Sequence, residues 1–244
     1  MLYKANKGQV SYGEAIGILM LDTYTPFIPG DVGNASTYDF PVRYETVEGL
    51  TVKRIFSKDI TAYDKLKNAA KKLEKQGVKA ITGDCGFMAI FQQKLVKDLD
   101  IPVFLSSMLQ VPFMSNIIGE NKKVGIISAN SKSLNDKKLL KEVGINDTTP
   151  IIIEGLEDKE EFNKSIIEEV GVLDSKKIEK EVVMTAKNMV TTEKNIGAIL
   201  LECSVLPPYS KAVHQATQLP VFDYITMINY VYSAIIQKQY TGIY

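Results

Sequence analysis

The chain has 244 residues, of which 45% are hydrophobic and 24% are charged, with 29 basic and 29 acidic side chains. This composition is that of a folded globular protein, and the balanced charge excludes bulk electrostatic attraction to nucleic acid or to an anionic membrane. No apolar run reaches the ~20 residues that span a bilayer, and residues 1–11 lack the apolar core of a secretory signal. We therefore expect a cytoplasmic protein that binds neither membrane nor nucleic acid.

Short apolar runs alternate with segments of helical periodicity along the whole chain, which is typical of α/β folds with parallel sheets. The predicted strands cover residues 15–21, 78–82, 102–105, 123–128, 151–153, 197–201 and 220–223. The predicted helices cover residues 62–76, 108–118, 133–143, 158–170, 175–194 and 224–239, with a further helix directly after Cys85. A long loop, 23–39, follows the first strand, and loops of this length in compact domains are usually functional.

An internal repeat connects the two halves of the sequence. The segment AITGDC ends at Cys85 and is followed 17 residues later by PVF, and AILLEC ends at Cys203 and is again followed 17 residues later by PVF. The opening strands match as well, as IGIL and VGII. The repeat predicts two pseudo-symmetric lobes, each an open parallel sheet with helices on both faces. We expect residues 1–118 plus 224–244 in the first lobe and residues 119–223 in the second.

The two cysteines occupy equivalent positions, each just after a buried strand. Ligands of open parallel sheets bind beyond the carboxyl ends of the strands, so facing lobes would bring Cys85 and Cys203 to opposite sides of one interlobe cleft. One thiolate could then remove a proton from a substrate carbon while the opposite thiol returns one. A single histidine and two cysteines 118 positions apart offer no metal-ligand set. We therefore expect no metal and no cofactor.

With the paired cysteines, the repeat and the loop PGDVGNAST over residues 29–37, the chain resembles the aspartate/glutamate racemase superfamily. The run ECSxxPPY, which begins at Glu202, resembles the hydantoin-racemase-like branch of that superfamily. The resemblance covers nearly the whole chain and implies that Cys85 and Cys203 are the acid/base pair. The Asn-Thr pair that often follows the first cysteine is here Gly86-Phe87, so one pair of hydrogen-bond donors is missing and the pocket is more apolar.

The resemblance also implies a set of substrate-binding residues. They are Asn34 and Thr37 in the first loop, Gly86 beside the first cysteine, Ser128 and Asn130 in the turn after the middle strand, and Ser204 after the second cysteine. Arg43 follows the long loop and could clamp a substrate carboxylate, or it could form an ion pair with Glu45 or Glu48. Asp84 and Glu202 directly precede the cysteines. Strand alternation would turn them away from the cysteine face, which favours structural hydrogen bonding over proton transfer.

We therefore predict an isomerase: a cofactor-independent racemase or epimerase of amino-acid metabolism, with an aspartate-, glutamate- or hydantoin-like carboxylate as substrate. One alternative keeps the scaffold and changes the reaction to that of a cysteine-dependent maleate-type cis-trans isomerase or a related lyase. Another alternative is a two-lobed protein that binds a small ligand without catalysis. Tyrosines and methionines at helical spacing within 224–232 predict core packing or a dimer face, and we expect a homodimer.

Overall fold

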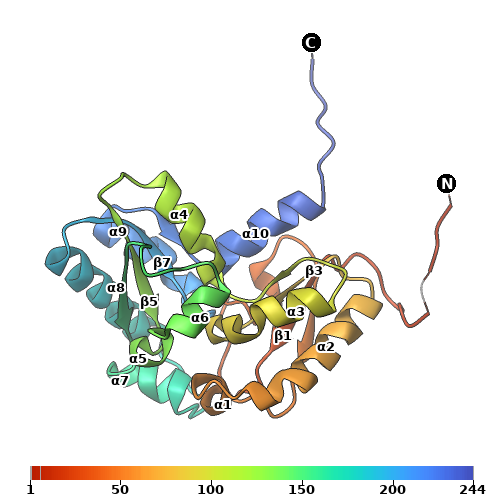
Figure 1. The fold of residues 1–244 in the computed structure, drawn as a ribbon, viewed down its shortest axis with the longest axis horizontal. Helices are drawn as coiled ribbons and strands as arrows, with labels where there is room; N and C mark the ends of the chain where they lie inside the picture. The colour runs from red at the N-terminus through yellow and green to blue at the C-terminus, as the bar shows by residue number, and fades with distance from the viewer. Residues whose placement is uncertain (1, 6, 244) are drawn as a thin grey trace.

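The computed structural model describes residues 2–5 and 7–243, and it contains two parallel four-stranded sheets (Figure 1). The first sheet has the order β2-β1-β3-β4 and the second the order β6-β5-β7-β8. The strands are β1 Ile16–Met20, β2 Val42–Thr46, β3 Ala80–Gly83, β4 Val103–Phe104, β5 Lys123–Ser128, β6 Ile151–Gly155, β7 Ile196–Leu201 and β8 Val221–Phe222. The predicted two-lobed α/β architecture is confirmed.

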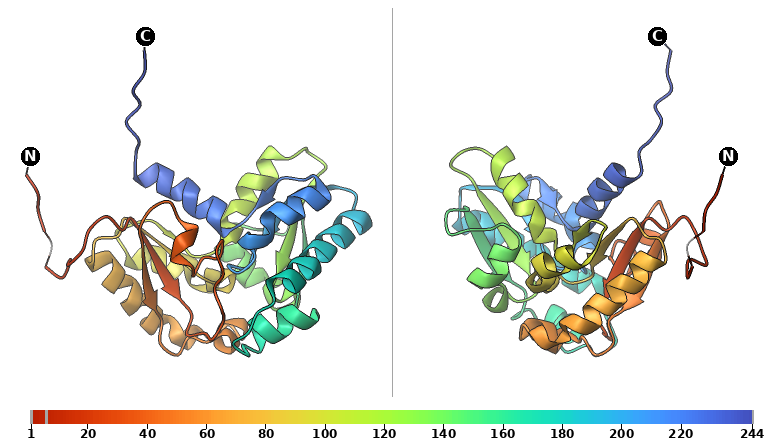
Figure 2. Two further views of the ribbon diagram at one scale, coloured as in Figure 1. Left: turned by 180° about the vertical axis from the view of Figure 1, so that it is seen from behind. Right: turned by 45° about the vertical axis from the view of Figure 1, so that its right-hand side comes forward.

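Helices surround both sheets (Figures 1 and 2). The α-helices are α1 Val52–Phe56, α2 Tyr63–Lys75, α3 Gln92–Asp98, α4 Val111–Ile117, α5 Ser131–Leu134, α6 Lys137–Glu142, α7 Glu160–Phe162, α8 Ser175–Thr192, α9 Ser210–Thr217 and α10 Tyr224–Ile235. The 3-10 helices are η1 Ala35–Thr37, η2 Ile60–Ala62, η3 Gly86–Phe91, η4 Ser107–Gln110 and η6 Pro207–Tyr209, and η5 Asn163–Ile167 is a π-helix.

The two sheets repeat each other strand by strand. Central β1 pairs with β2 and β3, and central β5 pairs in the same way with β6 and β7. The N–H of Asp84 donates to the carbonyl of Leu19, and the N–H of Glu202 donates to the equivalent carbonyl of Ile127. Cys85 and Cys203 therefore follow equivalent strands at equivalent positions.

Local structure departs from the predicted elements most clearly in three places. The edge strand β2 was not predicted, because its residues are only half-buried and include charged side chains. The helix predicted over 133–143 divides in two, because the Asp136 side chain accepts hydrogen bonds from the N–H groups of Lys138 and Leu139 and starts a new helix there. The helix predicted over 158–170 is a short α-helical turn followed by the π-helix η5.

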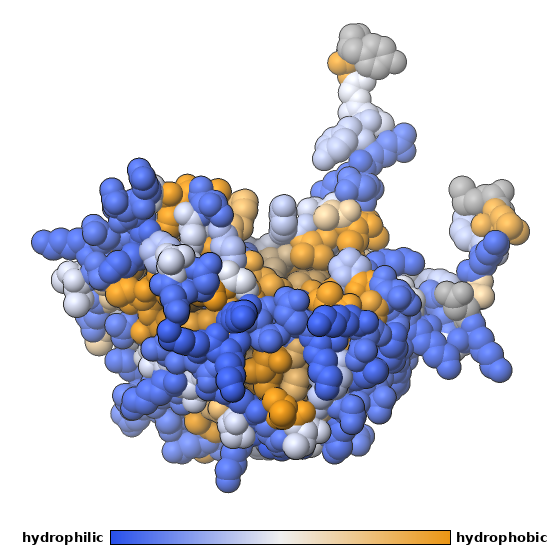
Figure 3. All heavy atoms as spheres, in the orientation of Figure 1, coloured by the Kyte–Doolittle hydropathy of each residue, from blue (hydrophilic) through white to orange (hydrophobic). Residues whose placement is uncertain are grey.

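The last helix, α10, returns from the second sheet to the first. Asp223 caps its N-terminus in a reciprocal arrangement with Thr226. Tyr224, Met227 and Ile228 are buried in one cluster with residues of β1. Figure 3 shows hydrophilic residues over most of the visible face and hydrophobic residues where α4 and α10 approach each other.

Candidate active site

Both cysteines line one pocket between the carboxyl ends of the two sheets. Cys85 and Cys203 are buried, with 7% and 8% of their surface exposed. The other lining residues are Leu21, Thr23, Thr25, Phe27, Val52, Phe56, Asp84, Gly86, Phe87, Ala129, Ile166, Glu202, Ser204 and Val205. The fold thus brings together two thiols that are 118 positions apart in the sequence.

The two thiols have matching surroundings. Each is the residue before a tight turn, in which Met88 N–H donates to the Cys85 carbonyl and Leu206 N–H to the Cys203 carbonyl. Burial, followed by the neighbouring Cys203 and Glu202, raises the pKa of Cys85 well above its usual value. Burial and Glu202 likewise raise the pKa of Cys203. Both thiols are therefore neutral near pH 7, and a positive charge close to them would favour the thiolate.

Asp84 lies in the pocket wall, not on the far side of its strand. The N–H of Leu21 donates to both of its carboxyl oxygens, at 3.0 and 3.1 Å. Burial raises the pKa of Asp84 to about 7. The expectation that Asp84 and Glu202 turn away from the cysteines is wrong, because β3 ends at Gly83 and β7 ends at Leu201, so strand alternation no longer applies to the residues that follow.

Glu202 is the second carboxyl of the pocket, and it is fully buried. The Ser128 hydroxyl donates to its Oε2 at 2.9 Å, whereas Oε1 has no hydrogen-bond partner. A Cβ atom built on Gly86 would lie 1.6 Å from Oε1, so the Glu202 carboxyl fills the space that a side chain at position 86 would need. Burial raises the pKa of Glu202 to about 7.

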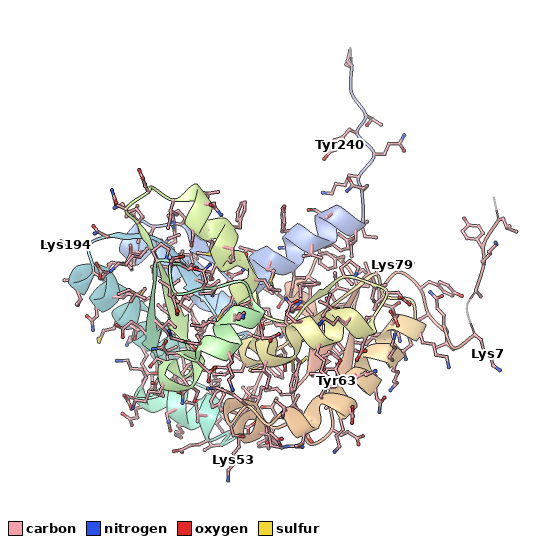
Figure 4. The ribbon with its side chains drawn as sticks, viewed as in Figure 1. Lys7, Lys53, Tyr63, Lys79, Lys194 and Tyr240 are labelled. Carbon is pink, nitrogen blue, oxygen red and sulfur yellow. The ribbon has the colours of Figure 1, made fainter. Side chains whose placement is uncertain are left out.

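The remaining pocket wall is mostly apolar. It includes Phe27, Phe56 and Phe87, and the ring centroids of Phe56 and Phe87 are 4.7 Å apart. Within the part of the chain that the structure describes, no lysine, arginine or histidine lines the pocket. Exposed lysines such as Lys53 and Lys194 lie at the periphery of the molecule (Figure 4). The pocket therefore offers thiols, carboxyls and hydroxyls, but no fixed positive charge.

Of the predicted substrate-binding residues, Gly86 and Ser204 line the pocket, whereas Asn34 and Thr37 do not. The Asn34 amide donates to the carbonyl of Phe27 and its side-chain oxygen caps η1. The Thr37 hydroxyl accepts from the N–H of Gly30 and donates to the carbonyl of Asp31. As a correction to the prediction, both residues shape the long loop and present no group to the pocket.

Three further predicted residues, Arg43, Ser128 and Asn130, are also not among the residues that line the pocket. Arg43 pairs with Glu14 at 2.8 Å and contacts Ser11, because β2 directs it toward the N-terminal segment. Ser128 acts through Glu202, and Asn130 caps α5 by accepting from the N–H of Ser133. Arg43 therefore forms an ion pair and does not provide the expected carboxylate clamp. Its partner is Glu14, not Glu45 or Glu48.

The start of the long loop contributes residues that were not singled out from the sequence. Thr23 and Thr25 line the pocket beside Phe27. The Thr23 hydroxyl and the Tyr24 N–H both donate to a carboxyl oxygen of Glu169 in the other lobe. The unusual length of this loop was the available signal, since loops of this kind commonly cover sites.

The described residues contain neither a metal-binding cluster nor a membrane-spanning helix. Within residues 2–5 and 7–243, no three His, Cys, Asp or Glu side chains are grouped so that they could hold a metal ion. No helix of the same residues combines the length and apolar character needed to cross a bilayer.

The two-lobed fold is that of solved racemase and decarboxylase structures. Aspartate racemase of Picrophilus torridus superposes with a TM-score of 0.51 and 19% identity, covering 86% of this chain and 89% of that one. Allantoin racemase of Pseudomonas fluorescens gives 0.54 and 16%, covering 90% and 89%. A variant of arylmalonate decarboxylase gives 0.60 and 13%, covering 90% and 92%. At these identities the likeness establishes the fold alone.

Sequence similarity identifies the family. The chain is 34% identical over 235 residues to a dimethylsulfoniopropionate lyase of Durusdinium sp. clade D, covering 94% of this chain and 77% of that protein. It is 34% identical over 238 residues to dimethylsulfoniopropionate lyase 3 of Emiliania huxleyi (strain CCMP1516), covering 94% of this chain but only 62% of that protein. No family model matches the chain. The chain belongs to the dimethylsulfoniopropionate lyase family.

This membership corrects the function expected from the sequence. The chain is related to enzymes, as expected, but the prediction of a racemase is wrong, because these relatives are lyases. The related-lyase alternative agrees with the comparison. Racemisation and elimination can both begin with removal of a proton from carbon by a thiolate, so paired cysteines do not distinguish them.

Proposed function

We propose that this protein is a lyase that cleaves dimethylsulfoniopropionate, a zwitterion with a dimethylsulfonium group at one end and a carboxylate at the other. The observation that carries the proposal is the pocket itself: two thiols and two carboxyls in an apolar wall, with no cationic side chain among the described residues that line it. A dicarboxylate such as aspartate would need positive charge that this wall does not offer. A sulfonium cation instead suits a wall that carries acidic groups.

The proposed reaction is a β-elimination in which one cysteine thiolate is the base. The thiolate takes a proton from the carbon beside the carboxylate, and the electrons of that C–H bond form the carbon–carbon double bond. The bond between the next carbon and sulfur breaks, and its electron pair stays on sulfur. The products are acrylate, neutral dimethyl sulfide and a protonated cysteine, so atoms and charge balance.

The pocket supports both ends of this substrate. The aromatic faces of Phe27, Phe56 and Phe87 suit the methyl groups of a sulfonium cation. The hydroxyl of Ser204 supplies a donor for the carboxylate, and the hydroxyls of Thr23 and Thr25 become donors when the contact between Thr23 and Glu169 opens. Because the raised pKa values keep the thiols neutral near pH 7, a bound sulfonium also favours loss of the thiol proton to solvent and so helps to form the thiolate.

Substrate entry requires the lobes to separate. The pocket encloses about 40 Å³, room for only about three water molecules, whereas the proposed substrate has eight non-hydrogen atoms. The contacts of Thr23 and Tyr24 with Glu169 join the lobes beside this pocket. We therefore expect these contacts to open and close during turnover.

The decisive experiment is to incubate the purified protein with dimethylsulfoniopropionate and follow acrylate by chromatography and dimethyl sulfide by gas chromatography. Cys85→Ser and Cys203→Ser are the test variants, and Arg43→Ala, which lies outside the pocket, is the matched control. We expect acrylate formation by the parent and a loss of about 10³-fold or more in at least one cysteine variant. Absence of acrylate with the folded parent, or near-parental rates in both cysteine variants, would refute the proposal.

A further inference from the structure

We propose that Glu202 is the counter-charge for the cationic end of the substrate, and that it makes the pocket selective for onium zwitterions over carboxylates of the same shape that lack the positive charge. This proposal rests on the proposed function for its natural ligand. It goes further because it assigns charge recognition to one named oxygen atom, Oε1, which has no other partner in the structure.

The hydrogen bonding of Glu202 leaves one of its oxygens available. Oε2 accepts from the Ser128 hydroxyl at 2.9 Å, which fixes the carboxyl group in place. Oε1 is buried and unpartnered, although buried carboxyl oxygens almost always have a hydrogen-bond partner. An unpartnered oxygen in the wall of a ligand pocket is best explained by a group that the ligand brings.

Asp84 provides the internal comparison. It occupies the equivalent position in the other lobe, but both of its oxygens accept from the N–H of Leu21. Its side chain is one methylene shorter than that of Glu202. Two carboxyls thus line the same pocket: both oxygens of Asp84 accept a hydrogen bond, whereas Oε1 of Glu202 accepts none.

The surroundings of Oε1 suit a methylated cation. The absent side chain of Gly86 lets the carboxyl lie against the chain next to Cys85. The adjoining rings of Phe56 and Phe87 provide an aromatic surface. A cation held there would have the carboxylate on one side and aromatic carbon on the other, the two features that recognise onium groups in proteins.

No protein cation competes for this carboxylate among the described residues. The titratable groups that interact with the pocket cysteines are Asp31, Asp84, Glu202 and Tyr224, all acids. An ionised Glu202 is therefore an uncompensated buried charge until a cation binds, and binding an onium ion removes that penalty.

The test compares two ligands that differ in charge but not in shape. They are the zwitterion 3-(trimethylammonio)propanoate and its carbon isostere 4,4-dimethylpentanoate, which keeps the carboxylate but lacks the positive charge. Isothermal titration calorimetry at pH 8 gives the ratio of their dissociation constants for the parent, for Glu202→Gln and for the matched control Asp84→Asn. Glutamine keeps the shape of glutamate and can still accept from Ser128.

We expect the parent to prefer the onium ligand by about tenfold or more, Glu202→Gln to lose most of that preference and Asp84→Asn to keep most of it. An unchanged preference in Glu202→Gln, or equal losses in both variants, would overturn the proposal. The parent alone provides a second readout that needs no variant. Its onium preference should fall as the pH is lowered from 8 to 5.5, and a preference that stays constant over this range counts against Glu202.

These measurements also separate this inference from the proposed function. Binding of the two probes requires no turnover of dimethylsulfoniopropionate. A parent that forms acrylate but whose onium preference does not depend on Glu202 refutes only the inference. A parent that forms no acrylate but shows the Glu202-dependent preference refutes only the lyase reaction.

Discussion

Replacing Gly86 by alanine tests the packing of the active site directly. The new Cβ would lie 1.6 Å from Oε1 of Glu202, 2.5 Å from its Cδ and 3.2 Å from its Cγ. The carboxyl group must therefore move by more than about 1 Å to restore van der Waals contact. Because Glu202 is fully buried, such a movement disturbs its bond with Ser128.

The size of the effect follows from these contacts. Overpacking a buried site costs about 1–3 kcal/mol, and a lost buried hydrogen bond costs about 1–3 kcal/mol more. Residue 86 is not among the glycines with positive φ, so alanine fits the backbone and recovers about 0.4–1 kcal/mol from the unfolded state. We expect a net loss of about 3 kcal/mol in the free energy of unfolding and a melting temperature lower by roughly 6–12 °C.

A double-mutant cycle identifies the cause. The free energy of unfolding, measured in urea, is compared for the parent, Gly86→Ala, Glu202→Ala and the double variant. Truncation of Glu202 removes the atoms that clash, so Gly86→Ala should cost less than about 1 kcal/mol in that background. If the alanine costs the same with and without the Glu202 side chain, the clash is not the reason that glycine occupies this position.

Three other outcomes are expected. Burial raises the pKa of Glu202 to about 7, against 4.5 for an unperturbed glutamate, so the folded state binds the proton more tightly than the unfolded state. The free energy of unfolding should therefore fall by about 3 kcal/mol as the pH rises from 4.5 through 7. Urea unfolding at a series of pH values measures this slope, and Glu202→Gln should flatten it. Glu169→Gln weakens the contact with Thr23 between the lobes, and we expect steady-state kinetics to show kcat and KM changing together, with a change in KM alone arguing against gating. Arg43→Ala removes an ion pair with Glu14 outside the pocket, so KM should stay within about twofold of the parent value, and a larger rise would restore its assignment to substrate binding.

The sequence repeat was sufficient to predict most of the fold. Equal spacing from each cysteine to the following PVF segment indicated equivalent lobes, and the two sheets have equivalent strand orders. The edge strand β2 was not predicted from the sequence, because Arg43 and Glu45 interrupt its apolar pattern. Edge strands are half-exposed, so their composition gives a weaker signal than that of central strands.

The site was harder to predict than the fold. Whether Asp84 and Glu202 face the cysteines depends on where each strand ends, and a shift of one residue reverses the answer. The racemase prediction also failed, because a proton-abstracting thiol does not by itself distinguish racemases from lyases. The charge of the pocket wall depends on where Arg43 points, which its position in the sequence does not reveal.

If the two lobes were exactly symmetric, the pocket would not distinguish the two ends of a substrate. An achiral zwitterion could then enter in two orientations, and either cysteine could serve as the base with equal probability. The lobes differ at several pairs of equivalent positions; at one of them Asp84 has both oxygens bonded by Leu21, whereas Glu202 keeps one oxygen unpartnered. If Glu202 holds the cationic end of the substrate as we propose, this pair gives the two lobes unequal tasks and the site one preferred substrate polarity.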